Sequence, residues 1–197
     1  MDVKEEKAGI RKEILRRRSA IPSKTLAEID KSLPDFIAGI EDPELQSRLR
    51  KAKRIALYRA YKGEVPVDGL AGSFMEKGIR CCFPRIENGN MIFFDCESLS
   101  DDEFEESPKG IKEPVLSATK ADSIDVVVLP AVAYNEEGVR LGMGGGYYDR
   151  YFGGRDNDRP YLLGICYEFQ ICSGVPVTDH DICADFIAVI PEEMYGE

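Results

Sequence analysis

The chain has 197 residues, enough to bury a sizeable core, and we expect a single domain over residues 1–197. Its 26 lysines and arginines against 36 acidic residues give a net charge of −10, which argues against a general nucleic-acid-binding or anionic-membrane-binding protein. No apolar run approaches the roughly 20 residues of a membrane span, and the N-terminus lacks a signal-peptide pattern. We therefore expect a cytoplasmic protein whose phosphate sites, if any, are local basic patches.

The first quarter of the chain has the periodicity of helices. Residues 3–20 are predicted to form a helix that ends at Ile21-Pro22. Ser23 is expected to cap a second helix, which Pro34 should bend or interrupt. Asp42-Pro43 has the form of the cap and first residue of a third, short helix.

Basic side chains form one stripe along the first predicted helix. At 100° per residue, they lie within about 60° of one another on the helix surface. The stripe consists of Lys4, Lys7, Arg11 and Arg18. Apolar residues flank it on both sides, so it faces the core, and a buried cation needs a partner. That partner is either a structural carboxylate or an anionic ligand, and the helix alone leaves both open.

The rest of the chain alternates between strand and helix patterns. Short apolar runs predict strands at 54–58, 79–83, 91–94, 124–129, 161–166 and 186–190. Several are continuous runs of Val, Ile and Leu, which is typical of strands covered on both faces. Helices are expected near 67–77 and from Tyr147 onward, so the pattern predicts an α/β sheet between helices. Residues 95–113 carry eight acidic residues and two lysines, which predicts a solvated acidic loop.

A glycine cluster follows the strand predicted at 124–129. It comprises Gly142, Gly144, Gly145 and Gly146. Glycines let a ligand approach the backbone, and the helix start at Tyr147 offers free N–H donors, so the segment has the properties of a phosphate cradle. It is not a Walker A loop, since the chain has no Gly-Lys dipeptide, and Tyr147 stands where the Rossmann fingerprint requires glycine. By itself, a glycine cluster of this kind more often forms a tight turn.

The surrounding motif is more specific. The segment Arg140-Leu-Gly-Met-Gly-Gly-Gly-Tyr-Tyr-Asp-Arg150, which follows Leu129-Pro130, resembles the signature of the 5-formyltetrahydrofolate cyclo-ligase family, also called 5,10-methenyltetrahydrofolate synthetases. The resemblance covers nearly the whole chain. Shorter matching elements occur in the family's order at Lys7-x-x-Ile10-Arg11, Gly63-Glu64-Val65, Phe83-Pro84-Arg85, Gly110-Ile111-Lys112-Glu113-Pro114 and His180-Asp181.

This resemblance implies an α/β three-layer sandwich with a mostly parallel central sheet, NagB/RpiA/CoA-transferase-like and Rossmann-like, with the helical N-terminal segment packed on it. It also implies a monomer that cyclises 5-formyltetrahydrofolate to 5,10-methenyltetrahydrofolate with ATP and Mg²⁺, releasing ADP and phosphate. The γ-phosphoryl group would pass to the formyl oxygen, N10 would attack the formyl carbon, and phosphate would leave. Such a route needs no protein nucleophile, and positioning and charge stabilisation supply the catalysis.

The resemblance also implies roles for individual residues. ATP contacts are expected from Lys7, Arg11, Arg140, Leu141, Gly142, Met143, Gly144, Gly145, Gly146, Tyr147 and Tyr148. Folate contacts are expected from Glu64, Arg59, Met143, Gly144, Gly145, Gly146 and Tyr147. Mg²⁺ ligands are expected at Asp149 and Asp181, whereas Arg85, Glu113 and His180 are given no place in the site.

Two other classes of protein stay open at this stage. One is a folate- or nucleotide-binding protein that has kept the fold without turnover. The other is an α/β sugar-phosphate or acyl-transfer enzyme, which would need a nucleophilic carboxylate or general base that the sequence does not reveal.

Overall fold

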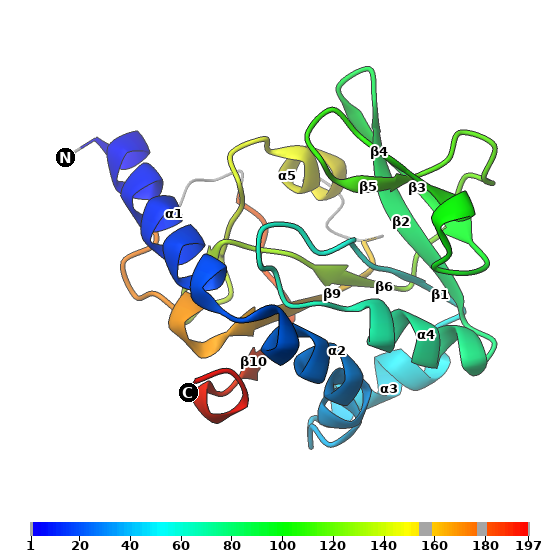
Figure 1. Ribbon diagram of the computed structural model, residues 1–197, viewed down its shortest axis with the longest axis horizontal. Helices are drawn as coiled ribbons and strands as arrows, with labels where there is room; N and C mark the ends of the chain where they lie inside the picture. Colours follow the sequence, from blue (N-terminus) through cyan, green and yellow to red (C-terminus); the bar gives the residue numbers. More distant parts are fainter. Residues whose placement is uncertain (1, 154–158, 177–180, 197) are drawn as a thin grey trace.

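The computed structural model describes residues 2–153, 159–176 and 181–196. Its main sheet has six strands in the order β10-β9-β6-β1-β2-β3 (Figure 1). They are β1 (Arg54–Ala56), β2 (Arg80–Glu87), β3 (Asn90–Cys96), β6 (Val126–Leu129), β9 (Tyr161–Tyr167) and β10 (Phe186–Ile190). All neighbours are parallel except β3, which runs antiparallel to β2. The predicted mostly parallel sheet and all six of its predicted strands are confirmed.

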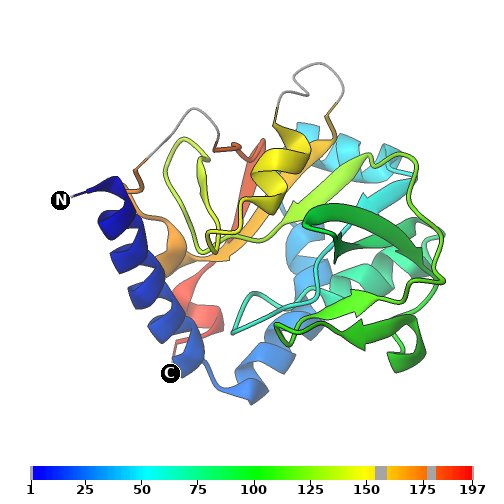
Figure 2. The same ribbon diagram turned by 90° about the horizontal axis from the view of Figure 1, so that it is seen from above.

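Helices cover both faces of this sheet, as Figures 1 and 2 show. One face packs against α2 (Ser23–Ala38), α3 (Pro43–Lys51) and α4 (Asp68–Glu76), and the other packs against α5 (Tyr147–Phe152). Alternation along the strands assigns side chains to the two faces: Ile55 faces α2 to α4, whereas the next residue, Ala56, faces α5. The three-layer α/β architecture is therefore confirmed.

The helix boundaries agree with the sequence except around α2. Asp42 caps α3 by accepting a hydrogen bond from the Leu45 N–H at 2.7 Å. However, α2 begins at Ser23 itself, so Ser23 is not its cap. Pro34 does not interrupt α2 either. Because proline has no N–H, the backbone carbonyl of Asp30 lacks its usual helical donor. Helix α4 packs against this carbonyl through Gly69, whose N–H donates to the Asp30 carboxylate at 2.9 Å.

The acidic segment 95–113 is mostly exposed to solvent, as its composition predicts, but it is not an irregular loop. It contains a short 3₁₀ helix, η1 (Asp101–Glu103), and strand β4 (Phe104–Glu106), which pairs antiparallel with β5 (Lys112–Pro114). Phe104 anchors the segment because its ring packs edge-on against Phe83, with ring centroids 5.3 Å apart. Burial of this one aromatic ring therefore stabilises regular structure in a segment whose composition is mostly acidic.

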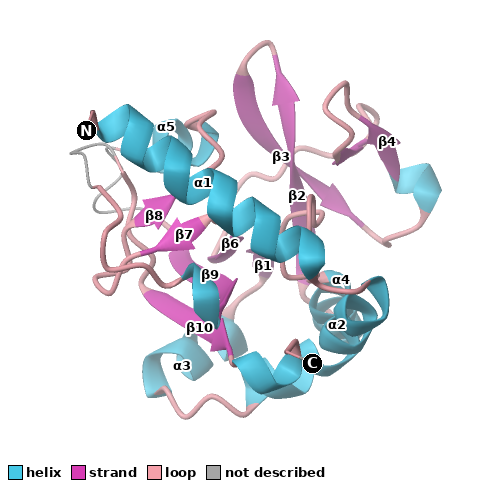
Figure 3. Cartoon of the chain, turned by 60° about the vertical axis from the view of Figure 1, so that its left-hand side comes forward, coloured by secondary structure: helices cyan, strands magenta, loops and turns pink. Residues whose placement is uncertain are grey.

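The first helix, α1 (Val3–Ala20), lies apart from the two helical layers. Figure 3 shows it crossing in front of β7 (Ala133–Tyr134) and β8 (Arg140–Leu141), which form a separate two-stranded sheet. It therefore packs over the loops at the carboxyl ends of the main strands, where open α/β sheets bind ligands. The described chain also contains 3₁₀ helices η2 (Glu168–Gln170) and η3 (Glu192–Met194). None of its helices has the length and apolar character required to span a bilayer.

Candidate active site

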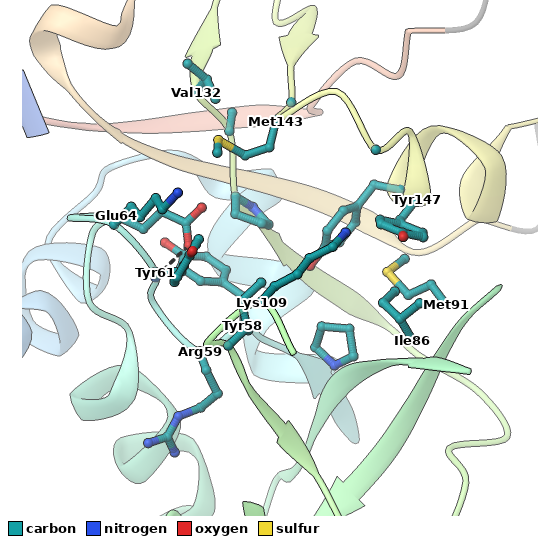
Figure 4. A pocket seen from close by; sticks show the side chains of 18 of the residues that line it. Tyr58, Arg59, Tyr61, Glu64, Ile86, Met91, Lys109, Val132, Met143 and Tyr147 are labelled. Atoms are coloured by element: carbon teal, nitrogen blue, oxygen red, sulfur yellow. Dashed lines mark hydrogen bonds between the residues drawn. The ribbon is translucent and has the colours of Figure 1, made fainter. Parts of the chain in front are cut away.

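A cavity of about 470 Å³ opens at the carboxyl ends of β1 and β6. Its walls come from the segment that follows β1, the β2–β3 hairpin, the segment before β5, and the glycine loop 142–146 with the start of α5 (Figure 4). This volume lies in the range of sites that bind cofactor-sized molecules. The lining is mostly apolar and aromatic, with a few polar groups directed inward.

The glycine loop forms one wall, and its glycines have local physical reasons. Gly146 adopts a left-handed φ of +62° immediately before α5, a conformation that favours glycine. A Cβ on Gly145 would lie 2.8 Å from the ring of Tyr147, so glycine allows this ring to lie against the loop. Of the residues predicted to contact folate or ATP, the loop contributes Gly142, Met143, Gly145 and Gly146 to the cavity lining.

Glu64 is the acidic side chain on the opposite wall. It lies in the loop after β1 with a side chain only 13% exposed, and it also lines the cavity (Figure 4). One carboxylate oxygen accepts the Tyr61 N–H at 3.0 Å, and the other lies 3.7 Å from Nη2 of Arg18. Burial raises the pKa of Glu64, and the Arg18 charge opposes that rise. The carboxylate is thus held at the cavity wall by a backbone donor and a buried cation.

Arg59, another residue predicted to contact folate, directs its guanidinium away from the cavity (Figure 4). Its Nη2 lies 3.3 Å from an Asp68 carboxylate oxygen, and its Cζ lies 4.4 Å from the centre of the Phe104 ring. Only the remainder of Arg59 reaches the lining. In this arrangement its charge stabilises the β4 region, and the predicted contact is limited to the stem of the side chain.

Arg11 contacts the glycine loop, and Lys7 of the same helix pairs with Asp181; neither cation lines the cavity. The Arg11 Nε donates to the carbonyl of Gly142 at 2.8 Å, and Lys7 Nζ lies 2.8 Å from an Asp181 carboxylate oxygen. Burial lowers the pKa of Arg11 while the nearby Asp181 charge raises it, so both cations share the same acidic neighbour. The loop therefore lines the cavity and also binds Arg11 of α1, whose neighbour Asp181 is paired with Lys7.

The inward orientation of the basic stripe holds for three of its four members. Lys4 is exposed, Lys7 and Arg11 are half-buried, and Arg18 is 1% exposed. Each of the three inward cations has a protein partner: Asp181, the Gly142 carbonyl, and the loop that carries Glu64. In the absence of a ligand, each inward cation of the stripe is thus paired within the protein.

Of the two predicted metal ligands, Asp149 lies close to the backbone of Ile182, the residue that follows Asp181. Asp149 accepts from Arg140 Nη2 through both carboxylate oxygens at 3.0 Å, and the Ile182 N–H lies 3.5 Å from one of them. Arg140 is 5% exposed, so this ion pair is largely buried. Within residues 2–153, 159–176 and 181–196, no cluster of three or more His, Cys, Asp or Glu side chains is arranged to hold a metal.

Several cavity residues were not predicted from the sequence. Ile86 and Met91 are paired across the β2–β3 hairpin and give the cavity an apolar wall. Lys109 spans the mouth, with its Nζ 5.3 Å from the centre of the Tyr147 ring. Glu113 also lines the cavity, although it was left out of the predicted site.

Two of these residues lie next to motifs that the sequence analysis identified without assigning them a role in the site. Phe83-Pro84-Arg85 precedes Ile86, and the element that begins at Gly110 follows Lys109. Arg85 itself stays outside the cavity lining and donates to the carbonyl of Pro114 at 2.7 Å. His180 lies outside the described residues.

The sheet is mostly parallel and has a partly apolar cavity at its carboxyl edge, with a glycine loop in its wall and half-buried cations nearby. This arrangement is typical of α/β proteins that bind small anionic molecules. The model of the 5-formyltetrahydrofolate cyclo-ligase family matches residues 3–190, and the chain belongs to this family. It is a ligase that acts on 5-formyltetrahydrofolate.

Individual relatives agree with this membership. The chain is 24% identical to the mouse 5-formyltetrahydrofolate cyclo-ligase over 93% of both chains. Among solved structures it resembles a 5,10-methenyltetrahydrofolate synthetase from Mycoplasma pneumoniae, at 27% identity and a TM-score of 0.69 over 95% of this chain and 98% of that one. The synthetase from Aquifex aeolicus gives 27% identity and a TM-score of 0.72 over 93% and 89%.

Proposed function

We propose that this protein, acting as a monomer, couples cleavage of ATP to the cyclisation of 5-formyltetrahydrofolate to 5,10-methenyltetrahydrofolate, with Mg²⁺ as the metal. The observation that carries the proposal is the position of the glycine loop 142–146. This loop lines a cavity of about 470 Å³ and accepts a hydrogen bond from Arg11, and Lys7 lies near Arg11 because both cations interact with Asp181. Two substrates that must react with each other are thereby given adjacent places.

The folate substrate occupies the cavity in this proposal. The apolar wall of Ile86 and Met91 and the ring of Tyr147 suit a flat heteroaromatic ring, and the Glu64 carboxylate accepts hydrogen bonds from its N–H donors. ATP lies along the glycine loop with its phosphates toward Lys7 and Arg11. Backbone N–H groups of the loop and these two cations hold negative charge without contributing a proton.

The reaction then needs little covalent chemistry from the protein. Transfer of the γ-phosphoryl group breaks its bond to ADP and converts the formyl oxygen into a phosphate leaving group. The N10 lone pair forms the new bond to the formyl carbon, the bond from that carbon to the phosphate oxygen breaks, and N10 loses its proton. This route requires no covalent bond between the substrate and the protein.

Asp149 and Asp181 are the residues that would hold Mg²⁺. Both side chains offer carboxylate oxygens as metal ligands, and Asp149 lies near Ile182, the residue after Asp181. In this molecule Asp149 is paired with Arg140 and Asp181 with Lys7. A site with only two carboxylates fits Mg²⁺, because this ion is usually bound by one or two carboxylates together with substrate phosphates and water. When bound, Mg²⁺ neutralises developing charge on the transferred phosphoryl group.

The test is formation of 5,10-methenyltetrahydrofolate, followed by its absorbance, in mixtures of the folded protein with 5-formyltetrahydrofolate, ATP and Mg²⁺. We expect one ADP and one phosphate per product and no reaction when either ATP or Mg²⁺ is omitted. Turnover without ATP contradicts the proposal. Tight folate binding without turnover under the complete conditions favours the alternative of a binding protein that has kept the fold.

A further inference from the structure

Arg18, near the end of α1, is a buried cation that the reaction described above does not use. Its side chain is 1% exposed and reaches the loop that follows β1. The Nε donates to the Lys62 carbonyl at 2.9 Å and Nη2 donates to the Tyr61 carbonyl at 2.6 Å. The same Nη2 lies 3.7 Å from a carboxylate oxygen of Glu64. One guanidinium therefore contacts three residues of a four-residue loop.

This loop has a backbone conformation that needs external support. Lys62 has a φ of +49° and Gly63 a φ of +70°, so two consecutive residues are in the left-handed region, and one of them is not glycine. Gly63 also lies directly on α1, because a Cβ there would be 2.7 Å from the backbone oxygen of Arg18. The Arg18 fork and the α1 backbone thus hold the loop from the same side.

Packing alone does not explain an arginine at this position. Within the described residues, Arg18 Nη1 is buried and has no hydrogen-bond partner, which adds to the cost of burying the charge. An apolar side chain of similar length would fill the space without that cost. The contacts that only arginine provides are the two parallel bonds to the Tyr61 and Lys62 carbonyls and the positive charge beside Glu64.

We propose that Arg18 is a positioning residue for folate binding: it fixes the 61–64 loop so that the Glu64 carboxylate, in its charged form, faces the cavity. The proposal rests on the assignment of Glu64 to the folate substrate under the proposed function. Arg18 itself does not line the cavity, so its effect on the substrate passes through Glu64.

The other charged and titratable groups near Glu64 keep the electrostatics simple. Arg140 is a second, fixed positive charge near it. Four tyrosines also face it, and burial raises the pKa of each, so all four stay neutral at ordinary pH: Tyr58, Tyr134, Tyr148 and Tyr167. Burial raises the pKa of Glu64, and the Arg18 charge opposes this rise more strongly than the Arg140 charge does.

The experiment compares Arg18→Met with Arg16→Met, a matched control. Arg16 lies on the same helix, but its side chain is 68% exposed and pairs only with Glu13 among the described residues. The pKa of Glu64 is measured by carboxyl ¹³C NMR, with the resonance identified by its absence in Glu64→Gln. We expect a rise of about one pH unit or more in Arg18→Met and no change in Arg16→Met.

Kinetics supply the second measurement. We expect Arg18→Met to raise KM for 5-formyltetrahydrofolate about tenfold at neutral pH, with kcat changed less than threefold and with part of the loss recovered as pH is raised. An unchanged Glu64 pKa overturns the proposal, and so does a raised pKa with wild-type KM. If Glu64→Gln also has wild-type KM, the error lies in the assignment of Glu64 to folate under the proposed function.

A conservative variant keeps the test decisive if Arg18→Met folds poorly. Arg18→Lys retains the charge but cannot bond both carbonyls at once. We expect it to leave the Glu64 pKa within about 0.3 units of wild type while KM for 5-formyltetrahydrofolate still rises severalfold. A wild-type KM in Arg18→Lys refutes the role of the guanidinium fork.

Discussion

The ion pair between Arg140 and Asp149 makes a prediction that separates a structural role of Asp149 from a metal-binding one. Arg140 is 5% exposed, and the Asp149 carboxylate accepts from its Nη2 twice at 3.0 Å. Removing one member of a buried pair costs about 3–5 kcal/mol because the other charge stays uncompensated. Arg140 keeps its bond to the Pro130 carbonyl at 3.2 Å, and the Asp149 side chain is 20% exposed, so we expect the lower end of that range.

Asp149→Ala should therefore lose about 3 kcal/mol of unfolding free energy. In urea, with a slope of about 2 kcal/mol per molar, this loss lowers the unfolding midpoint by about 1.5 M. The double variant with Arg140→Met should lose less than the sum of the single variants, with a coupling free energy of about 2 kcal/mol. A loss below 1 kcal/mol in Asp149→Ala, or additive single and double variants, would refute the reasoning from burial.

This stability effect changes how a loss of activity in Asp149→Ala is interpreted. An inactive Asp149→Ala protein is expected from either role, since the position of Arg140 beside the glycine loop also depends on the pair. Metal binding has a separate readout in Asp149→Asn, which keeps the size and one acceptor oxygen. If Asp149 holds Mg²⁺, the Mg²⁺ concentration for half-maximal rate rises at least tenfold in the folded Asn variant. An unchanged Mg²⁺ requirement leaves only the structural role.

Three further predictions concern the glycines of α4, the basic stripe and Glu64. Gly69→Ala should destabilise the protein by about 2 kcal/mol, because the new Cβ would lie 2.2 Å from a carbonyl oxygen of α2. Gly72→Ala should stabilise it by about 0.5–1 kcal/mol, because a Cβ there would have nothing within 4 Å and alanine favours the helix. Urea unfolding of both variants tests this difference. Lys7→Ala should raise KM for ATP about tenfold, whereas Lys4→Ala, exposed on the same helix, should not; equal values for both variants exclude a nucleotide contact from Lys7. Burial raises the folded-state pKa of Glu64, so folding favours its protonated form and the stabilisation from that form is lost as pH rises. The unfolding free energy of Glu64→Gln should therefore increase relative to that of the wild type from pH 5 to pH 8. A difference in unfolding free energy that stays constant over this range contradicts the raised pKa.

The sequence was sufficient for the sheet because the buried strands are continuous apolar runs. In β6, all of Val126–Leu129 is buried, and no polar alternation competes with that pattern. The short strands β4 and β5 were missed for the opposite reason. Their segment is dominated by charge, and its structure depends on Phe104 reaching Phe83, a contact between distant parts of the sequence.

Prediction of the site shows the same division between local and non-local information. The glycine loop and Glu64 were found through motifs, and the structure brings them to one cavity. Motifs do not say where a long side chain points. Arg59 lies in the correct segment, yet its guanidinium pairs with Asp68. The direction was decided by α4 and Phe104, which the sequence around Arg59 does not encode.

The charges of the site are balanced internally before any substrate arrives. Lys7 is paired with Asp181, Arg140 with Asp149, and Arg11 with the Gly142 carbonyl. On the proposed function, nucleotide binding does not add charges to an empty basic pocket; it exchanges partners. Phosphates would take over Lys7 and Arg11, and the released Asp181 would join Asp149 around Mg²⁺.

Such an exchange explains how an acidic protein can bind two anionic substrates. A body with a net charge of −10 repels ATP and folate at long range, and screening by salt weakens that repulsion. At short range, a phosphate on Lys7 would displace its ion pair with Asp181 and a phosphate on Arg11 would displace its hydrogen bond to the Gly142 carbonyl, so the cations alone would provide little net affinity. On the proposed function, affinity would then depend on the arrival of Mg²⁺ together with the nucleotide, because the metal would give the displaced carboxylates a new partner. Nucleotide without metal should accordingly bind weakly, even though the same lysine and arginine are available to it.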